Sequence, residues 1–140
     1  MQVHPYLFFD GRCDEALAFY AKAVGAKVTM AMRFKDAPDQ SMVAPGTQDK
    51  IMHAQFQLGD STIMASDGRC SGAMKFEGFT LTVAAKDEAE ADKVFGALSD
   101  SGTVTMPIAK TFFSPRFGML TDKFGVRWML NSDSGQAPKP

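Results

Sequence analysis

The sequence has 140 residues, of which 45% are hydrophobic and 22% are charged, and its formal net charge is -1. This balance is typical of one globular domain, or of two small halves that share a core. Charges of both signs are scattered without a basic run, so the composition favours neither nucleic acid nor a membrane surface as a partner. No apolar stretch reaches the roughly 18 residues that a spanning helix needs. The N-terminus also lacks the basic and apolar regions of a secretory signal, so we expect a cytoplasmic protein.

The first half of the chain predicts a strand, a helix and three further strands. Residues 3–9 alternate as a half-buried strand does, with Leu7 and Phe9 on one face and Tyr6 and Phe8 on the other. Gly25 is a stop signal for the helix that precedes it. The elements expected after this strand are a helix over 13–24, a strand over 27–34, a polar loop over 35–49, and a hairpin of strands 51–58 and 61–66.

The second half repeats this order after a Gly-containing connector over 67–78. Two segments, DEALAFYAKAVGAKVTM and DEAEADKVFGALSDSGTVTM, both begin Asp-Glu-Ala and end Val-Thr-Met. Two others, GDSTIMASD and FGVRWMLNSD, both turn at a glycine, run apolar and stop at Ser-Asp. Matched elements in the same order predict a duplication. The elements expected in the second half are strand 79–84, helix 87–100 and strands 103–108, 116–121 and 126–131. We therefore predict one domain of two βαβββ modules, 1–67 and 78–133, with a polar tail over 134–140.

Three segments of the sequence resemble the PhnB-like branch of the vicinal oxygen chelate superfamily, which includes glyoxalases, bleomycin-resistance proteins and extradiol dioxygenases. They are PYLFFDGRCDEALAFY, IMHAQFQLGDSTIMASD and TFFSPRFGMLTDKFGVRWMLN, and the resemblance covers nearly the whole chain. It implies an α+β fold in which two βαβββ modules form curled mixed sheets with cup-like faces, and it implies a homodimer. The superfamily hosts isomerases, lyases, oxygenases and non-catalytic binders, so the resemblance leaves the activity open.

The resemblance also implies where a metal would be held. Metal-dependent members place a His or Gln on the first strand of each module and a Glu on the last. His4 matches the first of these positions, whereas Gly78, Met64 and Met129 match the other three. A thioether is a soft, uncharged ligand that suits the usual ions of this chemistry poorly. We therefore expect neither a metal nor another cofactor.

Candidate site residues include two polar side chains, His53 and Arg127, and a set of apolar ones. His53 shares a strand face with Gln55 and Gln57, where it could act as an acid or base, or could simply belong to a solvent-exposed or interface face. Arg127 could clamp a carboxylate or phosphate, or could be a surface arginine paired with Asp122 or another acid. The side chains expected to line an apolar site, unless all of them are core, are Tyr6, Phe8, Met64, Phe112, Phe113, Phe117, Met119 and Met129.

The sequence favours a metal-independent small-molecule-binding protein of the PhnB-like branch, with a small-molecule ligand and a second copy as its partners. The alternative is an isomerase, lyase or similar enzyme that uses His4 or His53, with or without an atypically bound divalent metal, although His4 also suits an ordinary residue near a frayed terminus. A third interpretation is a structural dimer without a ligand. PhnB-like sequences often carry the name of a demethylubiquinone methyltransferase, but this sequence has no G-x-G-x-x-G signature for S-adenosylmethionine. Cys13 and Cys70 belong to no C-x-x-C motif, and we expect them to be small, partly buried side chains.

Overall fold

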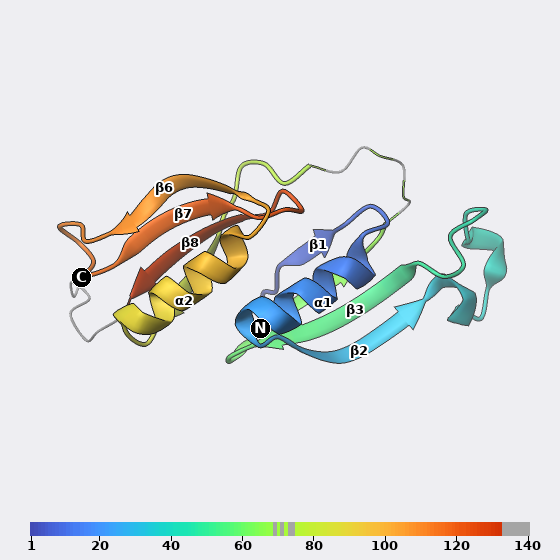
Figure 1. Cartoon of the computed structure of the whole chain (residues 1–140). Coiled ribbons are helices and arrows are strands. Elements are labelled where there is room, and N and C mark those ends of the chain that lie inside the picture. The colour runs from blue at the N-terminus through green and yellow to red at the C-terminus, as the bar shows by residue number, and fades with distance from the viewer. Residues whose placement is uncertain (69, 71, 73–74, 133–140) are drawn as a thin grey trace. The chain divides into compact units, whose positions relative to one another are not determined.

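Two units of the chain share one element order, a strand, a helix and three strands (Figure 1). The computed structural model describes residues 1–68, 70, 72 and 75–132, and it divides the chain into the units Met1–Met74 and Lys75–Pro140. Residue 133, the expected tail over 134–140 and part of the connector over 67–78 lie outside the described residues. The α+β class and the curled mixed sheets expected from the resemblance are confirmed.

Unit 1 is a four-stranded mixed sheet with one helix on it. Its elements are β1 (Tyr6–Phe8), α1 (Cys13–Val24), β2 (Lys27–Arg33), β3 (Ile51–Leu58) and β4 (Ser61–Ser66). The strand order is β1-β4-β3-β2, in which β1 and β4 are parallel and the other neighbours are antiparallel. Two 3-10 turns, η1 (Phe34–Asp36) and η2 (Gln40–Met42), occupy part of the segment between β2 and β3 that was expected to be an irregular loop.

Unit 2 repeats this arrangement with different residues. Its elements are β5 (Leu81–Ala85), α2 (Glu88–Ser99), β6 (Thr103–Ala109), β7 (Phe117–Thr121) and β8 (Arg127–Ser132). The strand order is β5-β8-β7-β6, again with the first pair parallel and the other pairs antiparallel. Neither helix among the described residues is long and apolar enough to cross a membrane.

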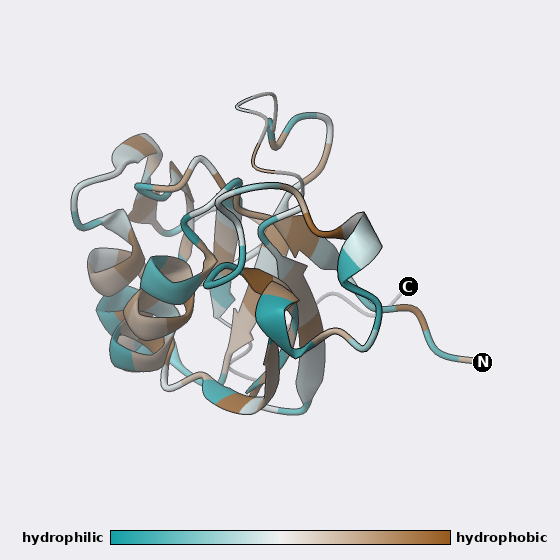
Figure 2. Cartoon of the chain, turned by 90° about the vertical axis from the view of Figure 1, so that its right-hand side faces the viewer, coloured by the Kyte–Doolittle hydropathy of each residue, from teal (hydrophilic) through white to brown (hydrophobic). Residues whose placement is uncertain are grey.

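Each helix forms where its apolar residues fall on one side. In α1, Ala16, Leu17 and Tyr20 are buried, and the ring of Tyr20 stacks on Phe56 of β3 with centroids 5.9 Å apart. Gly25 ends this helix in the left-handed region, with a φ of 70° that glycine adopts without strain. Figure 2 shows hydrophilic and hydrophobic residues interleaved along both helices, as expected of helices with one buried face.

The second helix begins at a side-chain cap. The carboxylate of Asp87 accepts a hydrogen bond of 2.8 Å from the backbone N–H of Glu90, which satisfies one of the free donors of the first turn. Ala91, Phe95 and Leu98 form the buried side of α2. Trp128 and Leu130 of β8 are also buried, whereas Arg127 and Met129 alternate with them.

Seven of the ten expected elements had wrong bounds, all by a few residues at their ends. Three of them, β2, β6 and β7, differ by one residue at one end. The first strand begins at Tyr6 rather than at residue 3, and the fifth begins at Leu81 rather than at residue 79. The second helix covers Glu88–Ser99 because Asp87 and Asp100 are its caps. The last strand is shifted by one residue, to Arg127–Ser132. The expected bounds of α1, β3 and β4 agree with the structure.

Asp67 is a buried carboxylate that joins three segments of unit 1. It follows β4 directly and is 0% exposed. Its Oδ1 accepts hydrogen bonds of 2.8 Å from the backbone N–H groups of Gly11 and Cys13, and its Oδ2 accepts one of 2.8 Å from Ile51. This side chain therefore ties the end of β4 to the start of α1 and to the start of β3.

Candidate functional site

One face of each sheet carries the helix, and we call the other the open face of that unit. In unit 1, Tyr6 of β1 lies directly beside Met64 of β4, which lies beside Gln55 of β3. Because residues paired across a sheet point to the same side, these three side chains share the open face. Tyr6 and Phe8 are 39% and 40% exposed, so both rings remain accessible there.

A chain of polar contacts crosses the open face of unit 1. The hydroxyl of Tyr6 lies 2.8 Å from Nδ1 of His53, and Nε2 of His53 lies 3.3 Å from Nε2 of Gln55. The ring of Phe8 stacks on that of Tyr6, with centroids 5.0 Å apart. The structure thus brings the expected pair Tyr6 and Phe8 together with His53 and Gln55 of another strand, although 47 positions separate Tyr6 from His53.

The tautomer of His53 sets the direction of this chain, because each ring nitrogen can donate or accept. With the proton on Nδ1, Nε2 accepts a hydrogen bond from the amide of Gln55, and Nδ1 donates to the oxygen of Tyr6. In this tautomer the hydroxyl hydrogen of Tyr6 is not used by His53, and a third group can accept it. With the proton on Nε2, Nδ1 instead accepts the hydroxyl hydrogen of Tyr6 and is the basic nitrogen of the ring.

The phenol of Tyr6 stays protonated over a wide pH range. Its partial burial raises the pKa above the ordinary value of 10.0, although the nearby hydroxyl of Ser66 opposes this effect. The hydroxyl of Ser66 accepts a hydrogen bond of 2.9 Å from the backbone N–H of Gly68. Tyr6 is therefore a neutral hydrogen-bond donor at physiological pH.

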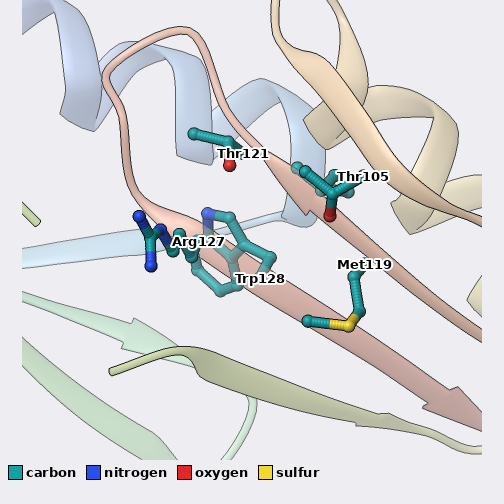
Figure 3. Close-up of a pocket in the computed structure, with 6 residues that line it drawn as sticks. Thr105, Met119, Thr121, Arg127 and Trp128 are labelled. Carbon is teal, nitrogen blue, oxygen red and sulfur yellow. The ribbon is translucent and has the colours of Figure 1, made fainter. Parts of the chain in front are cut away.

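The open face of unit 2 carries different chemistry. Met129 of β8 pairs with Thr82 of β5 and with Met119 of β7, and Arg127 pairs with Thr121. A depression of about 260 Å³ lies at this end of the face. Figure 3 shows Thr121, Arg127 and Trp128 on one side of it and Thr105 and Met119 on the other. Among the residues expected to line a ligand site, Arg127 and Met119 border this depression.

The proposed pairing of Arg127 with Asp122 is not found. Both carboxylate oxygens of Asp122 face inward: Oδ1 accepts hydrogen bonds from the backbone N–H groups of Phe124 and Val126, and Oδ2 accepts one of 2.9 Å from the indole of Trp128. Asp122 is only 3% exposed. Within the described part of the chain, Arg127 has no ion pair and its side chain is exposed.

An aromatic cluster lies between β6 and β7. Phe113 packs edge-on against both Phe112 and Phe117, with ring centroids 5.1 and 4.9 Å away. Phe112 is 100% exposed and Phe113 is 39% exposed, so neither belongs to the core of unit 2. Their role in binding stays a prediction.

The other histidine is not held as His53 is. His4 lies two residues before β1, and its side-chain contact is with the nearby Gln2, whose Oε1 is 3.2 Å from Nε2. His4 therefore belongs to the segment before the sheet rather than to the first strand, where it was expected.

The donor set does not fit the metal that the superfamily implies. Met64 and Met129 occupy the open faces of β4 and β8, where metal-dependent members carry a glutamate in the last strand. Gly78 lies outside β5 and has no side-chain ligand. Among the residues that the structure describes, no group of three or more His, Cys, Asp or Glu side chains could hold an ion.

Two residues of the depression were not among the expected site residues. They are Thr105, which reaches it from β6, and Thr121, which reaches it from β7. The segment Val104-Thr105-Met106 repeats Val28-Thr29-Met30, and in both copies the strand pairing shifts across the threonine. This repeated Val-Thr-Met was noted as evidence of duplication, but its irregular pairing could not be foreseen from the sequence.

The comparisons with known proteins agree on one family. A model of the family described as 3-demethylubiquinone-9 3-methyltransferase matches residues 1–131. The chain is 35% identical over 139 residues to protein YjdN of Escherichia coli K12, which covers 94% of this chain and 95% of YjdN.

Solved structures resemble the whole chain. Protein PA1353 from Pseudomonas aeruginosa is 37% identical with a TM-score of 0.84, over 94% of this chain and 97% of that one. A putative 3-demethylubiquinone-9 3-methyltransferase, PhnB protein, from Bacillus cereus is 28% identical with a TM-score of 0.79, over 94% and 99%. The fosfomycin resistance protein FosX from Listeria monocytogenes is 9% identical with a TM-score of 0.64, over 96% and 93%, and shares the fold. The chain therefore belongs to the PhnB-like family of the superfamily of glyoxalases and bleomycin-resistance proteins.

Proposed function

We propose that the protein binds a small organic molecule on the open face of unit 1. The observation that carries this proposal is the contact chain Tyr6–His53–Gln55, in which the Nδ1–H tautomer of His53 leaves the hydroxyl hydrogen of Tyr6 available beside two accessible rings. Small-molecule sites usually combine an apolar wall with a few oriented polar groups. Met64 and Phe8 supply the wall here, and Tyr6 supplies the oriented donor.

The ligand that suits this face has a planar apolar part and an acceptor oxygen. The rings of Tyr6 and Phe8 stack on each other with an interplanar angle of 29° and offer an aromatic surface. An acceptor oxygen in reach of Tyr6 completes the chain of hydrogen bonds. A conjugated or aromatic carbonyl compound has both features, so we assign the ligand to this class.

An NMR titration of the full chain with acetophenone and ethylbenzene tests the proposal. The two probes have similar shapes, but only acetophenone has an acceptor oxygen, so it should bind more tightly. One hydrogen bond is worth about 1 kcal/mol, so Tyr6→Phe should weaken the binding of acetophenone about fivefold and make the two probes equal. Thr82→Val is the matched control, because Thr82 holds the position on β5 of unit 2 that Tyr6 holds on β1. Equal binding of both probes by the wild-type protein, or no binding of either, would show that the proposal is wrong.

A second candidate function is acid–base catalysis by His53. The observation that favours it is the contact of 2.8 Å between its imidazole and the phenol of Tyr6, since such a pair can pass a proton to or from a bound ligand. It favours His53 over His4, whose side chain contacts only Gln2 among the described residues. Exchange of the methyl protons of acetophenone with deuterium from the solvent would reveal the activity, and His53→Ala should abolish it.

Methyl transfer is not part of the proposal. The description of the matching family model names a methyltransferase, but the sequence has no Gly-rich signature for S-adenosylmethionine.

The homodimer stays a proposal. It is supported by the large apolar side chains of the edge strands β2 and β6. These are Val28, Met30, Val104 and Met106, each between 38% and 45% exposed.

A further inference from the structure

The pairing of the strands equates positions in the two units. Val28-Thr29-Met30 of β2 corresponds to Val104-Thr105-Met106 of β6, because each segment shifts its pairing at the threonine. On the next strands, Gln57 pairs with Thr62 as Thr121 pairs with Arg127. The positions of Thr29, Gln57 and Thr62 in unit 1 are therefore those of Thr105, Thr121 and Arg127 in unit 2.

The side chains at these three positions of unit 1 form hydrogen bonds within their own sheet. The hydroxyl of Thr29 donates a hydrogen bond of 3.3 Å to the backbone carbonyl of Gln55. The amide of Gln57 donates one of 2.5 Å to the hydroxyl of Thr62. These groups use their hydrogen-bonding capacity within the sheet and leave little for a ligand.

The side chains at the corresponding positions in unit 2 have no hydrogen-bond partner among the described residues. Within the described ranges, the side chains of Thr105, Thr121 and Arg127 make no hydrogen bond and no ion pair. The nearest acid along the chain, Asp122, is turned inward and held by Phe124, Val126 and Trp128. A guanidinium and two hydroxyls thus border one depression with no carboxylate of their own.

The depression is suited to a small anionic group. Its volume of about 260 Å³ is below the roughly 300–1,000 Å³ of drug-sized pockets, so it suits a head group rather than a large molecule. Arginine presents a planar fork that matches the oxygens of a carboxylate or phosphate. Met119 pairs with Met129 on the open face and offers apolar contact to the carbon part of a ligand, whereas Trp128 is only 2% exposed.

We propose that this depression of unit 2 binds the oxyanion group of a small organic molecule, with Arg127 as its counter-ion and Thr105 and Thr121 as hydrogen-bond donors. This site and the open face of unit 1 use different residues. The proposal therefore does not depend on the ligand class proposed for Tyr6 and His53.

Calorimetric titration of the full chain with benzoate, phenyl phosphate, inorganic phosphate and benzyl alcohol tests this proposal. Benzoate and phenyl phosphate should bind more tightly than uncharged benzyl alcohol, and added sodium chloride should weaken them. The better of the two organic anions identifies carboxylate or phosphate as the preferred head group. Inorganic phosphate that binds as tightly as phenyl phosphate would show that the apolar wall contributes nothing and would overturn the organic part of the proposal.

Substitutions assign the binding to the depression. Arg127→Gln should weaken the preferred anion about tenfold or more, and Arg127→Lys should weaken it less because the charge remains but the fork is lost. Thr121→Val should weaken it about two- to fivefold, which keeps the test valid even if a variant of Arg127 is misfolded. Lys93→Gln is the control, because Lys93 is an exposed cation of α2 outside the depression. Equal affinity for benzoate and benzyl alcohol, binding of none of the anions, or no effect of Arg127→Gln in a folded variant would overturn the proposal.

Discussion

Asp67→Asn replaces one carboxylate oxygen by an amide group, and this small change should strongly destabilise the protein. The carboxylate of Asp67 is 0% exposed and accepts three backbone hydrogen bonds of 2.8 Å. Asparagine has nearly the same shape but only one acceptor oxygen. If that oxygen keeps the hydrogen bonds from the N–H groups of Gly11 and Cys13, the NH2 group of Asn faces the N–H of Ile51. Two hydrogen-bond donors then point at each other.

The expected loss follows from the three bonds. A hydrogen bond to a charged group is worth about 1.5–3 kcal/mol and a neutral one about 1 kcal/mol, so the two retained bonds lose about 2 kcal/mol together. The donor of Ile51, buried without its partner, costs about 1–3 kcal/mol more. The free energy of unfolding should therefore fall by about 3–5 kcal/mol, out of a total of about 5–15 kcal/mol for a protein of this size.

Urea unfolding followed by far-UV circular dichroism measures this loss. With a slope near 2 kcal/mol per molar urea, the midpoint should fall by about 1.5–2.5 M. Asp60→Asn makes the same chemical change in the exposed turn between β3 and β4 and should leave the midpoint nearly unchanged. A loss below about 1 kcal/mol for Asp67→Asn would refute the reasoning, because it would mean that the three bonds do not support the fold.

Two further predictions concern packing and the cysteines. Gly118→Ala should destabilise the protein by about 2 kcal/mol, because the new Cβ would lie 2.7 Å from the ring of Phe95 and 2.9 Å from the backbone of Ile108. Gly96→Ala, with open space at its Cβ inside α2, should instead raise the melting temperature slightly; equal effects of the two changes would contradict this. Burial and the charge of Asp67 raise the pKa of the Cys13 thiol to about 12, so in the native protein a thiol reagent at pH 8 should modify at most the partly exposed Cys70. Rapid modification of two thiols without denaturant would show that Cys13 is accessible.

Local patterns were sufficient to predict most of the fold. The helix over Cys13–Val24 follows from its apolar stripe and from Gly25, and the hairpin of β3 and β4 follows from two apolar strands around Gly59 and Asp60. Alternation along β8 also separated the buried Trp128 and Leu130 from the exposed side of the strand. These features depend on neighbours within a few residues, which is why one sequence is enough to find them.

Contacts between distant segments were not predictable in this way. The sequence placed Tyr6 on the cup face of its strand and His53 on one strand face with Gln55 and Gln57, but the contact between Tyr6 and His53 depends on how β1, β4 and β3 align. Likewise, Ser66 and Ser132 are not equivalent, although the sequence match aligned them. The strand pairing that makes Met64 equivalent to Met129 makes Ser66 equivalent to Asn131. Alternation gives the face of a residue, whereas register, which side-chain packing sets over the whole sheet, gives its neighbours.

The two units share a backbone pattern but differ in chemistry at equivalent positions. Tyr6, His53 and Gln55 of unit 1 correspond to Thr82, Phe117 and Met119 of unit 2, so the polar chain has no copy in the second sheet. Conversely, the cationic position of unit 2 is a neutral threonine in unit 1, where glutamine satisfies it. A requirement of the fold alone would act on both units alike, because the same strands meet in the same order. Residues that differ while the framework is shared are therefore better candidates for ligand contacts than the apolar residues that both units keep.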